Sequence, residues 1–155
     1  MLPLEIIRNQ QRIDSVVNEI DAAIVDVSPS LQGVLSSHLV ILASGHVELS
    51  VKELIKRYGD AHGNRQIVRF MDKTIDRENS LNCEKIENIL SRLDRGWWPR
   101  LSSSIEPDEI SAIDSLKALR DQVAHGRFNG TGFMTVRNYY HGAKKFVTKL
   151  DEIVA

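Results

Sequence analysis

Hydrophobic residues recur along almost the whole chain at spacings of three and four, which is the period of an α-helix. In the first segment, residues 4 to 27, they are Ile13, Val16, Val17, Ile20 and Ile24, and Ser28-Pro29 ends the segment. No stretch shows the strict alternation of apolar and polar residues that is typical of a strand. The pattern predicts an all-α protein.

The next segment is the longest and most apolar, and we expect it to be the central helix. Ser30 can cap it, and it extends to about Tyr58, because the residues from 59 to 63 have the composition of a turn. It carries two apolar stripes, one of Leu31, Leu35, Leu39, Leu42 and Leu49 and one of Val40, Val47, Val51 and Leu54. Gly45 could kink this helix. Glu48, inside the apolar part, is expected to face solvent rather than to partner an arginine.

Four further helices are predicted from the remaining periodicity. Apolar residues mark one around 67–75 and another around 86–93, the latter capped near Ser80 or Asn82. Residues 96–99 then break the pattern, and we expect the two tryptophans there to fill the core beneath a loop. A penultimate helix runs from Pro107 to His125, and the last helix follows a loop at 128–132. Residues 1–155 therefore form one domain, an up-and-down bundle of about five to six helices.

The composition excludes several classes of protein and site. The single cysteine, Cys83, rules out an internal disulfide and argues against a zinc–thiolate site. The five histidines lack metal-binding spacings, so we expect no metal and no cofactor. The N-terminus does not resemble a signal peptide, and no uncharged apolar run is long enough to span a bilayer. We expect a soluble cytoplasmic protein that does not contact a membrane.

Charge is unevenly distributed, although the net charge is only −1. Residues 1–27 contain five acidic and two basic side chains. Residues 116–149 contain seven basic side chains and one acidic side chain, Asp121. This basic region could attract a polyphosphate such as RNA. The alternative is an ordinary solvated helix face.

The segment from Leu116 to Gly126 holds the residues best suited to chemistry. Leu116, Leu119 and Val123 form one apolar stripe, and Gly126 is typical of a helix end. Arg120 then lies one turn or more before His125, the last side chain of the helix, where the helix dipole favours a protonated imidazole. This pair suits phosphate chemistry, because histidine can transfer a proton while arginine stabilises negative charge.

The Arg-to-His spacing alone is a weak signal. Arg57 and His62 show the same spacing, but the glycines around them suggest that this second copy lies in a loop. Five residues at roughly 100° each place Arg120 and His125 about 140° apart around an ideal helix. A long arginine arm, a tightened last turn or a second subunit could close this gap. The alternative is that Arg120 is a structural ion-pair partner and His125 only a helix-end residue.

Three segments resemble HEPN domains of prokaryotic defence and toxin systems. Arg120-Asp-Gln-Val-Ala-His-Gly126 resembles the signature of that superfamily, an arginine followed by a polar residue and, after four to six residues, a histidine. Ser44-Gly-His-Val-Glu-Leu-Ser50 and Phe133-Met-Thr-Val-Arg-Asn-Tyr-Tyr140 resemble its RiboL-PSP-like branch. Together the resemblance covers residues 35 to 150 in outline.

The resemblance implies a metal-independent endoribonuclease of a toxin–antitoxin or phage-defence system, acting as a homodimer. Arg120 and His125 would be catalytic, Asp121 would orient or tune His125, and Arg127 and Arg137 would bind the RNA backbone. His141 could add to this site, although a surface position is the simpler expectation. A cognate antitoxin or regulatory protein could be a partner. The alternative is a non-catalytic HEPN module that binds nucleotide, RNA or a partner protein.

Overall fold

The computed structural model describes residues 1–128 and 130–155, and within these ranges it contains seven α-helices and no strand. The helices are α1 (Leu4–Ala23), α2 (Pro29–His62), α3 (Arg65–Ile75), α4 (Cys83–Leu93), α5 (Trp97–Ser102), α6 (Pro107–Ala124) and α7 (Phe133–Val154). One turn of 3-10 helix, Ile24–Asp26, follows α1. The all-α prediction is confirmed. The predicted loop at 128–132 includes Asn129, which lies outside the described residues.

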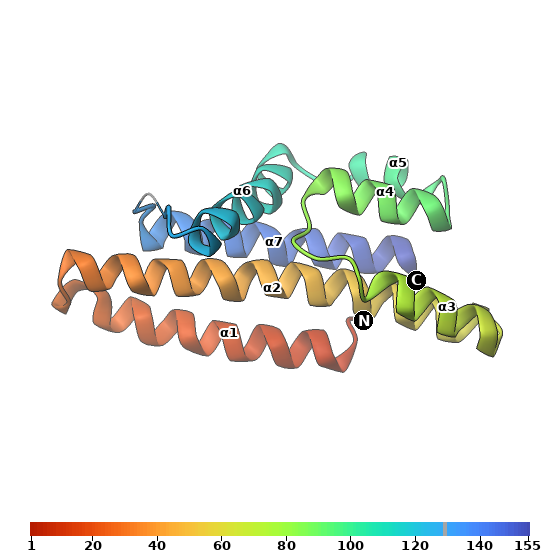
Figure 1. Cartoon of the computed structure of the whole chain (residues 1–155), viewed down its shortest axis with the longest axis horizontal. Helices are drawn as coiled ribbons and strands as arrows, with labels where there is room; N and C mark the ends of the chain where they lie inside the picture. The colour runs from red at the N-terminus through yellow and green to blue at the C-terminus, as the bar shows by residue number, and fades with distance from the viewer. Residues whose placement is uncertain (129) are drawn as a thin grey trace.

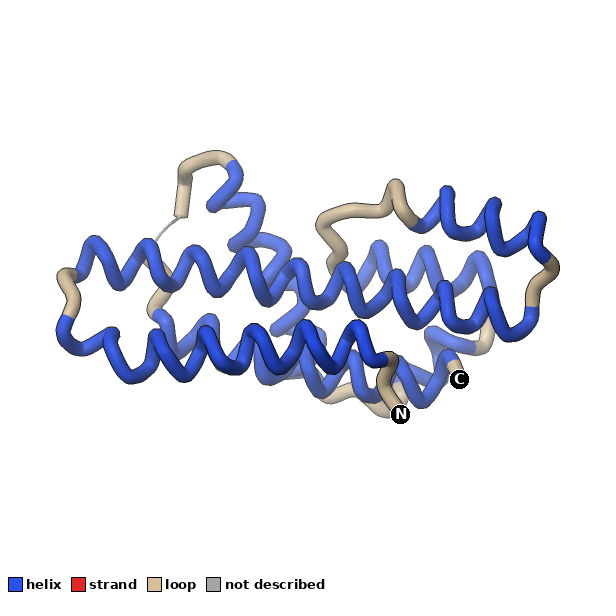
Figure 2. The backbone as a smooth tube through the Cα atoms, turned by 90° about the horizontal axis from the view of Figure 1, so that it is seen from below, coloured by secondary structure: helices blue, strands red, loops and turns tan. Residues whose placement is uncertain are grey.

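Four long helices form an up-and-down bundle (Figure 1). α1 and α2 make one antiparallel hairpin and α6 and α7 a second, while α3, α4 and α5 lie toward the far end of α2. α2 is central, because it packs against α1, α3, α6 and α7. The two termini lie close together (Figures 1 and 2), and the Met1 amino group is 3.5 Å from the Asp151 carboxylate.

The two apolar stripes of α2 are not equally buried. Val40, Val47, Val51 and Leu54 all lie in the core. In the other stripe only Leu39 is fully buried, and Leu31 is exposed. One 18-residue window of α2 is apolar enough to cross a membrane by length and composition, but half of that window is buried inside the bundle. Its place in the core therefore accounts for the apolar character of α2.

The ends of α2 differ from the prediction on both sides. Ser28, not Ser30, is the N-cap, because its Oγ accepts a hydrogen bond from Leu31 N–H at 3.3 Å. The predicted turn at 59–63 is wrong, since α2 stays helical as far as His62. Gly59 lies against α3, where a Cβ would come within 3.3 Å of Met71 Cε. Packing against α3 outweighs the low helix propensity of glycine.

The predicted break after α4 contains the additional helix α5. Its proline, Pro99, lies in the first turn, where backbone N–H groups have no helical partner to lose. Trp97 is buried and meets the Tyr58 ring edge-on at a centroid distance of 4.8 Å, which confirms its predicted place in the core. Trp98 is only half-buried. Asn82 caps α4, one of the two predicted positions.

Candidate active site at the end of helix α6

The C-terminal end of α6 has the geometry predicted from its glycine. Gly126 has a φ of +66°, in the left-handed region that favours glycine. Its N–H donates to the Val123 carbonyl at 3.1 Å, and the Arg127 N–H donates to the Gln122 carbonyl at 2.7 Å. These two bonds are the Schellman motif, which satisfies the last carbonyls of a helix. His125 is therefore the cap residue, immediately outside the regular helix.

The His125 side chain is exposed at this helix end. Its backbone N–H donates to the Asp121 carbonyl at 3.1 Å. Within residues 1–128 and 130–155, no group forms a hydrogen bond with its imidazole. The ring is therefore available to a ligand or to a second protein chain.

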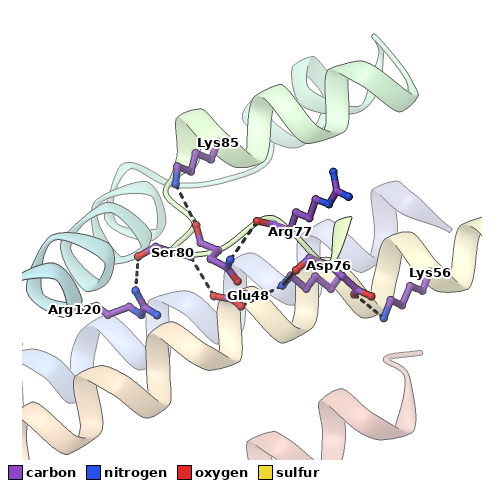
Figure 3. A network of polar contacts seen from close by, with 9 residues as sticks. Glu48, Lys56, Asp76, Arg77, Ser80, Lys85 and Arg120 are labelled. Atoms are coloured by element: carbon purple, nitrogen blue, oxygen red, sulfur yellow. Dashed lines mark hydrogen bonds and ion pairs between the residues drawn. The ribbon is translucent and has the colours of Figure 1, made fainter. Parts of the chain in front are cut away.

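Arg120 and Asp121 are joined through the Ser80 hydroxyl, which comes from the α3–α4 loop. Figure 3 shows the contact between Ser80 and Arg120. Arg120 Nη1 donates to Ser80 Oγ at 2.7 Å, and this hydroxyl donates to Asp121 Oδ1 at 3.3 Å. Asp121 Oδ2 also pairs with Lys117, one turn earlier in α6. The hydrogen bond from Lys117 is the main cause that lowers the pKa of the Asp121 carboxyl. The Asp121 carboxylate thus contacts Ser80 and Lys117, and its expected role of orienting or tuning His125 stays a prediction.

Ser80 and Glu48 are two residues of this site that the sequence did not reveal. Glu48 Oε2 accepts the Ser80 N–H at 3.1 Å, and its Oε1 pairs with Lys52 at 3.2 Å. Glu48 was expected to face solvent rather than to partner an arginine; it is instead partly buried and contacts Ser80 and Lys52. Glu48 does lie in one of the three segments that carry the family resemblance. Ser80 was predicted only as a possible helix cap, and no pattern in the sequence links it to Arg120, which lies 40 residues later.

The basic region at residues 116–149 is largely neutralised within the fold. Four of its seven basic side chains are ion-paired: Lys117 with Asp121, Arg137 with Asp21, Lys144 with Asp14, and Lys149 with Glu109. Two of these pairs join α7 to the acidic helix α1, so the uneven charge reflects the packing of these two helices. Arg127 is exposed beside His125. Arg137 Nη1 lies 3.2 Å from Asp21 Oδ1. RNA binding by Arg137 stays a prediction, and a phosphate would have to compete with Asp21 for this side chain.

The second Arg-to-His copy, at Arg57 and His62, was expected in a loop, and this prediction is wrong. Both residues belong to α2, and His62 is its last residue. Arg57 Nη2 is held by Asp151 Oδ1 at 2.7 Å. The His62 ring stacks on Tyr58 and its Nδ1 lies 2.9 Å from the Tyr58 carbonyl. Helical context therefore does not separate the two copies, whereas the contacts of their histidines do.

A separate polar cluster lies between α1, α2 and α7. His46 is fully buried, with Nδ1 2.8 Å from Asn9 Oδ1 and Nε2 3.3 Å from Gln10 Nε2. The Tyr140 hydroxyl donates to Asp14 Oδ1 at 2.8 Å. Burial, reinforced by the nearby positive charge of Lys144, lowers the pKa of His46 from 6.5 to about 4. Its hydrogen bonds are satisfied inside the bundle, so this cluster stabilises the fold.

Other candidate chemistry is absent from the described part of the chain. Burial is the main cause that raises the pKa of the Cys83 thiol to about 12, so it is not a nucleophile at neutral pH. The described residues contain no group of three or more His, Cys, Asp or Glu side chains that could hold a metal ion. His141 is exposed, as expected of a surface residue.

Comparison with known proteins identifies the family of this helical domain. The model of the RiboL-PSP-HEPN family matches residues 7–155, which is nearly the whole chain. The comparisons with curated proteins and with solved structures find no match. The resemblance expected from three short segments is therefore confirmed over the full bundle. The chain belongs to the RiboL-PSP-HEPN family, a HEPN family associated with ribonuclease activity.

Proposed function

We propose that this protein is a metal-independent endoribonuclease whose active site lies at the end of α6. The observation that carries the proposal is the exposed imidazole of His125, which forms no hydrogen bond among the described residues and lies at the C-terminal cap of the helix that holds Arg120. Arg120 is bound by a neutral hydroxyl, so its positive charge stays available to a phosphate. Family membership supports the same function.

The proposed reaction is an intramolecular transesterification of the RNA phosphodiester. The 2′-oxygen forms a bond to the neighbouring phosphorus and loses its proton, and the bond from phosphorus to the 5′-oxygen breaks as that oxygen gains a proton. The products are a 2′,3′-cyclic phosphate and a 5′-hydroxyl. His125 transfers the proton, and Arg120 stabilises the charged phosphate oxygens. Arg127, beside His125, binds the RNA backbone.

We propose that the active unit is a homodimer in which two copies of this site face each other. α6 ends over the first half of α2 (Figure 1). There α2 exposes Leu31, Val34 and Ile41 by 44%, 59% and 40%, so no helix of the same chain covers them. Their separations of three and seven residues place them on one face of α2. A second copy of the chain on this face would bring its own Arg120 toward His125.

The cellular setting is part of the proposal. A ribonuclease that is not regulated can degrade the RNA of its own cell. We therefore propose a toxin–antitoxin or phage-defence role, with an antitoxin or regulatory protein as a partner. Growth arrest when the chain is expressed alone, but not when it carries His125→Ala, is the expected result.

An RNA cleavage assay in EDTA tests the enzymatic proposal. We expect wild type to cut RNA, and His125→Ala to lose at least a hundred-fold in rate because its general acid–base group is gone. His62→Ala is the matched control, since it removes a histidine at the same spacing from an arginine and also at a helix end. Equal activity of wild type and His125→Ala, or loss of cutting in EDTA alone, contradicts the proposal.

A non-catalytic binding module is the second candidate. The observation that favours it is the internal use of Arg120 and Asp121, whose polar groups already bond Ser80 and Lys117. This alternative predicts that the double variant Arg120→Ala and His125→Ala binds RNA or a partner protein as wild type does, and that neither form cuts RNA.

A further inference from the structure

The α3–α4 loop, residues 76–82, is fixed across α2 and α6. At its start the Asp76 carboxylate pairs with Lys56 of α2 at 3.1 Å (Figure 3). At its end the Cys83 N–H donates to Asp114 Oδ1 of α6 at 2.9 Å. Ser80 therefore lies in a segment that is anchored on both sides to the two helices between which it stands.

Ser80 is held in a strained conformation. Its φ of 56° is the one positive φ at a non-glycine residue in the described parts of the chain. A residue with a Cβ keeps such a conformation only where its surroundings impose it. Here Glu48 binds its N–H, and Arg120 and Asp121 bind its hydroxyl. The strain therefore coincides with the contact to the proposed active site.

The Ser80 hydroxyl suits the task of holding an arginine without cancelling its charge. A carboxylate in this place would form an ion pair with Arg120 and compete with a phosphate. The two nearby carboxylates form their ion pairs with lysines and not with Arg120, Glu48 with Lys52 and Asp121 with Lys117. One hydroxyl accepts from Arg120 and donates to Asp121, so it fixes both side chains although they point about 100° apart on the helix.

We infer that Ser80 is a positioning residue for the Arg120–His125 site, held in place by Glu48 of α2. It acts through Arg120 and does not touch substrate. This inference rests on the proposed ribonuclease function. It extends the site to a loop and a helix that the Arg-to-His motif does not include.

Three substitutions separate positioning from stability. Ser80→Ala removes the hydroxyl and keeps the strain, Ser80→Gly removes both, and Ser80→Thr keeps the hydroxyl in a strained backbone. We expect kcat for RNA cleavage to fall about ten- to a hundred-fold in the alanine and glycine variants alike, with KM changed less, and to be retained by threonine. We expect the Tm values to follow the backbone strain instead, with Ser80→Gly about 2–4 °C above Ser80→Ala.

If wild type cuts RNA, the cleavage assay decides whether Ser80 has a positioning role. The inference is supported if cleavage activity is lost in both variants without the hydroxyl, whatever their Tm, and is retained in Ser80→Thr. Activity that follows Tm, with glycine restoring it, overturns the inference and leaves the ribonuclease proposal intact.

A second measurement does not depend on cleavage. In ¹⁵N NMR spectra of the Arg120 guanidinium, we expect restricted rotation in wild type and Ser80→Thr and averaged signals in Ser80→Gly, with Arg57 as the internal reference. If wild type proves inactive, the ribonuclease proposal fails while this measurement still tests whether Ser80 positions Arg120. Identical Arg120 spectra in wild type and Ser80→Gly overturn the inference.

Discussion

Acidification should destabilise the fold through His46, the buried histidine between α1, α2 and α7. In the folded protein its pKa is lowered to about 4, mainly by burial, whereas the ordinary value is 6.5. Below pH 6.5 the unfolded chain therefore takes up a proton that the folded protein does not bind. The stabilisation is present above pH 6.5 and is lost as pH falls toward 4. The difference in pKa corresponds to about 3 kcal/mol in the free energy of unfolding.

Urea denaturation at pH 7 and pH 4.5 measures this effect. Acidic groups also titrate in this range, so the comparison that matters is between wild type and His46→Gln, which carries the same carboxylates. We expect wild type to lose about 2–3 kcal/mol more than His46→Gln between the two pH values. His38→Gln, which removes an exposed histidine from the same helix, should behave as wild type does.

One result would refute the reasoning. If wild type and His46→Gln lose the same free energy of unfolding between pH 7 and pH 4.5, His46 is not buried in a neutral form. Its two hydrogen bonds, to Asn9 and Gln10, would then not hold the imidazole in its neutral form.

Two glycines give further predictions for the free energy of unfolding, each measured in urea. A Cβ on Gly142 would lie 2.7 Å from the Ala112 Cβ, so Gly142→Ala should cost about 1–3 kcal/mol by forcing α7 from α6. Ala112→Gly should restore part of this loss, and no recovery in the double variant would show that the clash is elsewhere. Gly126→Ala should cost about 1 kcal/mol through backbone strain alone, because no atom lies within 4 Å of the added Cβ. Gly126→Asn should cost less, and an equal cost would argue against the left-handed geometry.

The end of α6 could be predicted from the sequence because its signals are local. The helix ends at Gly126 because glycine readily adopts a positive φ, and it begins at Pro107 because the fixed φ of proline suits the first turn. Such signals act within a few residues and do not depend on the rest of the fold. The position of His125 at the helix end followed from them.

The contacts that shape the site could not be predicted in this way. Ser80 reaches Arg120 across 40 residues, and no periodic pattern encodes such a contact. Glu48 was assigned to solvent because its partner, the Ser80 N–H, belongs to that same loop. The continuation of α2 through Gly59 likewise depends on α3, since the intrinsic preference of glycine points the other way. These are tertiary effects that override local propensity.

The ion pairs between α1 and α7 have a consequence for how RNA would be held. Of the seven positive side chains at residues 116–149, only Arg120, Arg127 and Lys145 remain free of an ion pair within the described residues. Each phosphate neutralised releases condensed counterions, so three such contacts give a slope of only about −2 in log K against log salt for one chain. Binding of this kind tolerates physiological ionic strength. If RNA binds as proposed, long-range attraction would contribute little, and short-range contacts at the site would determine which RNA is bound.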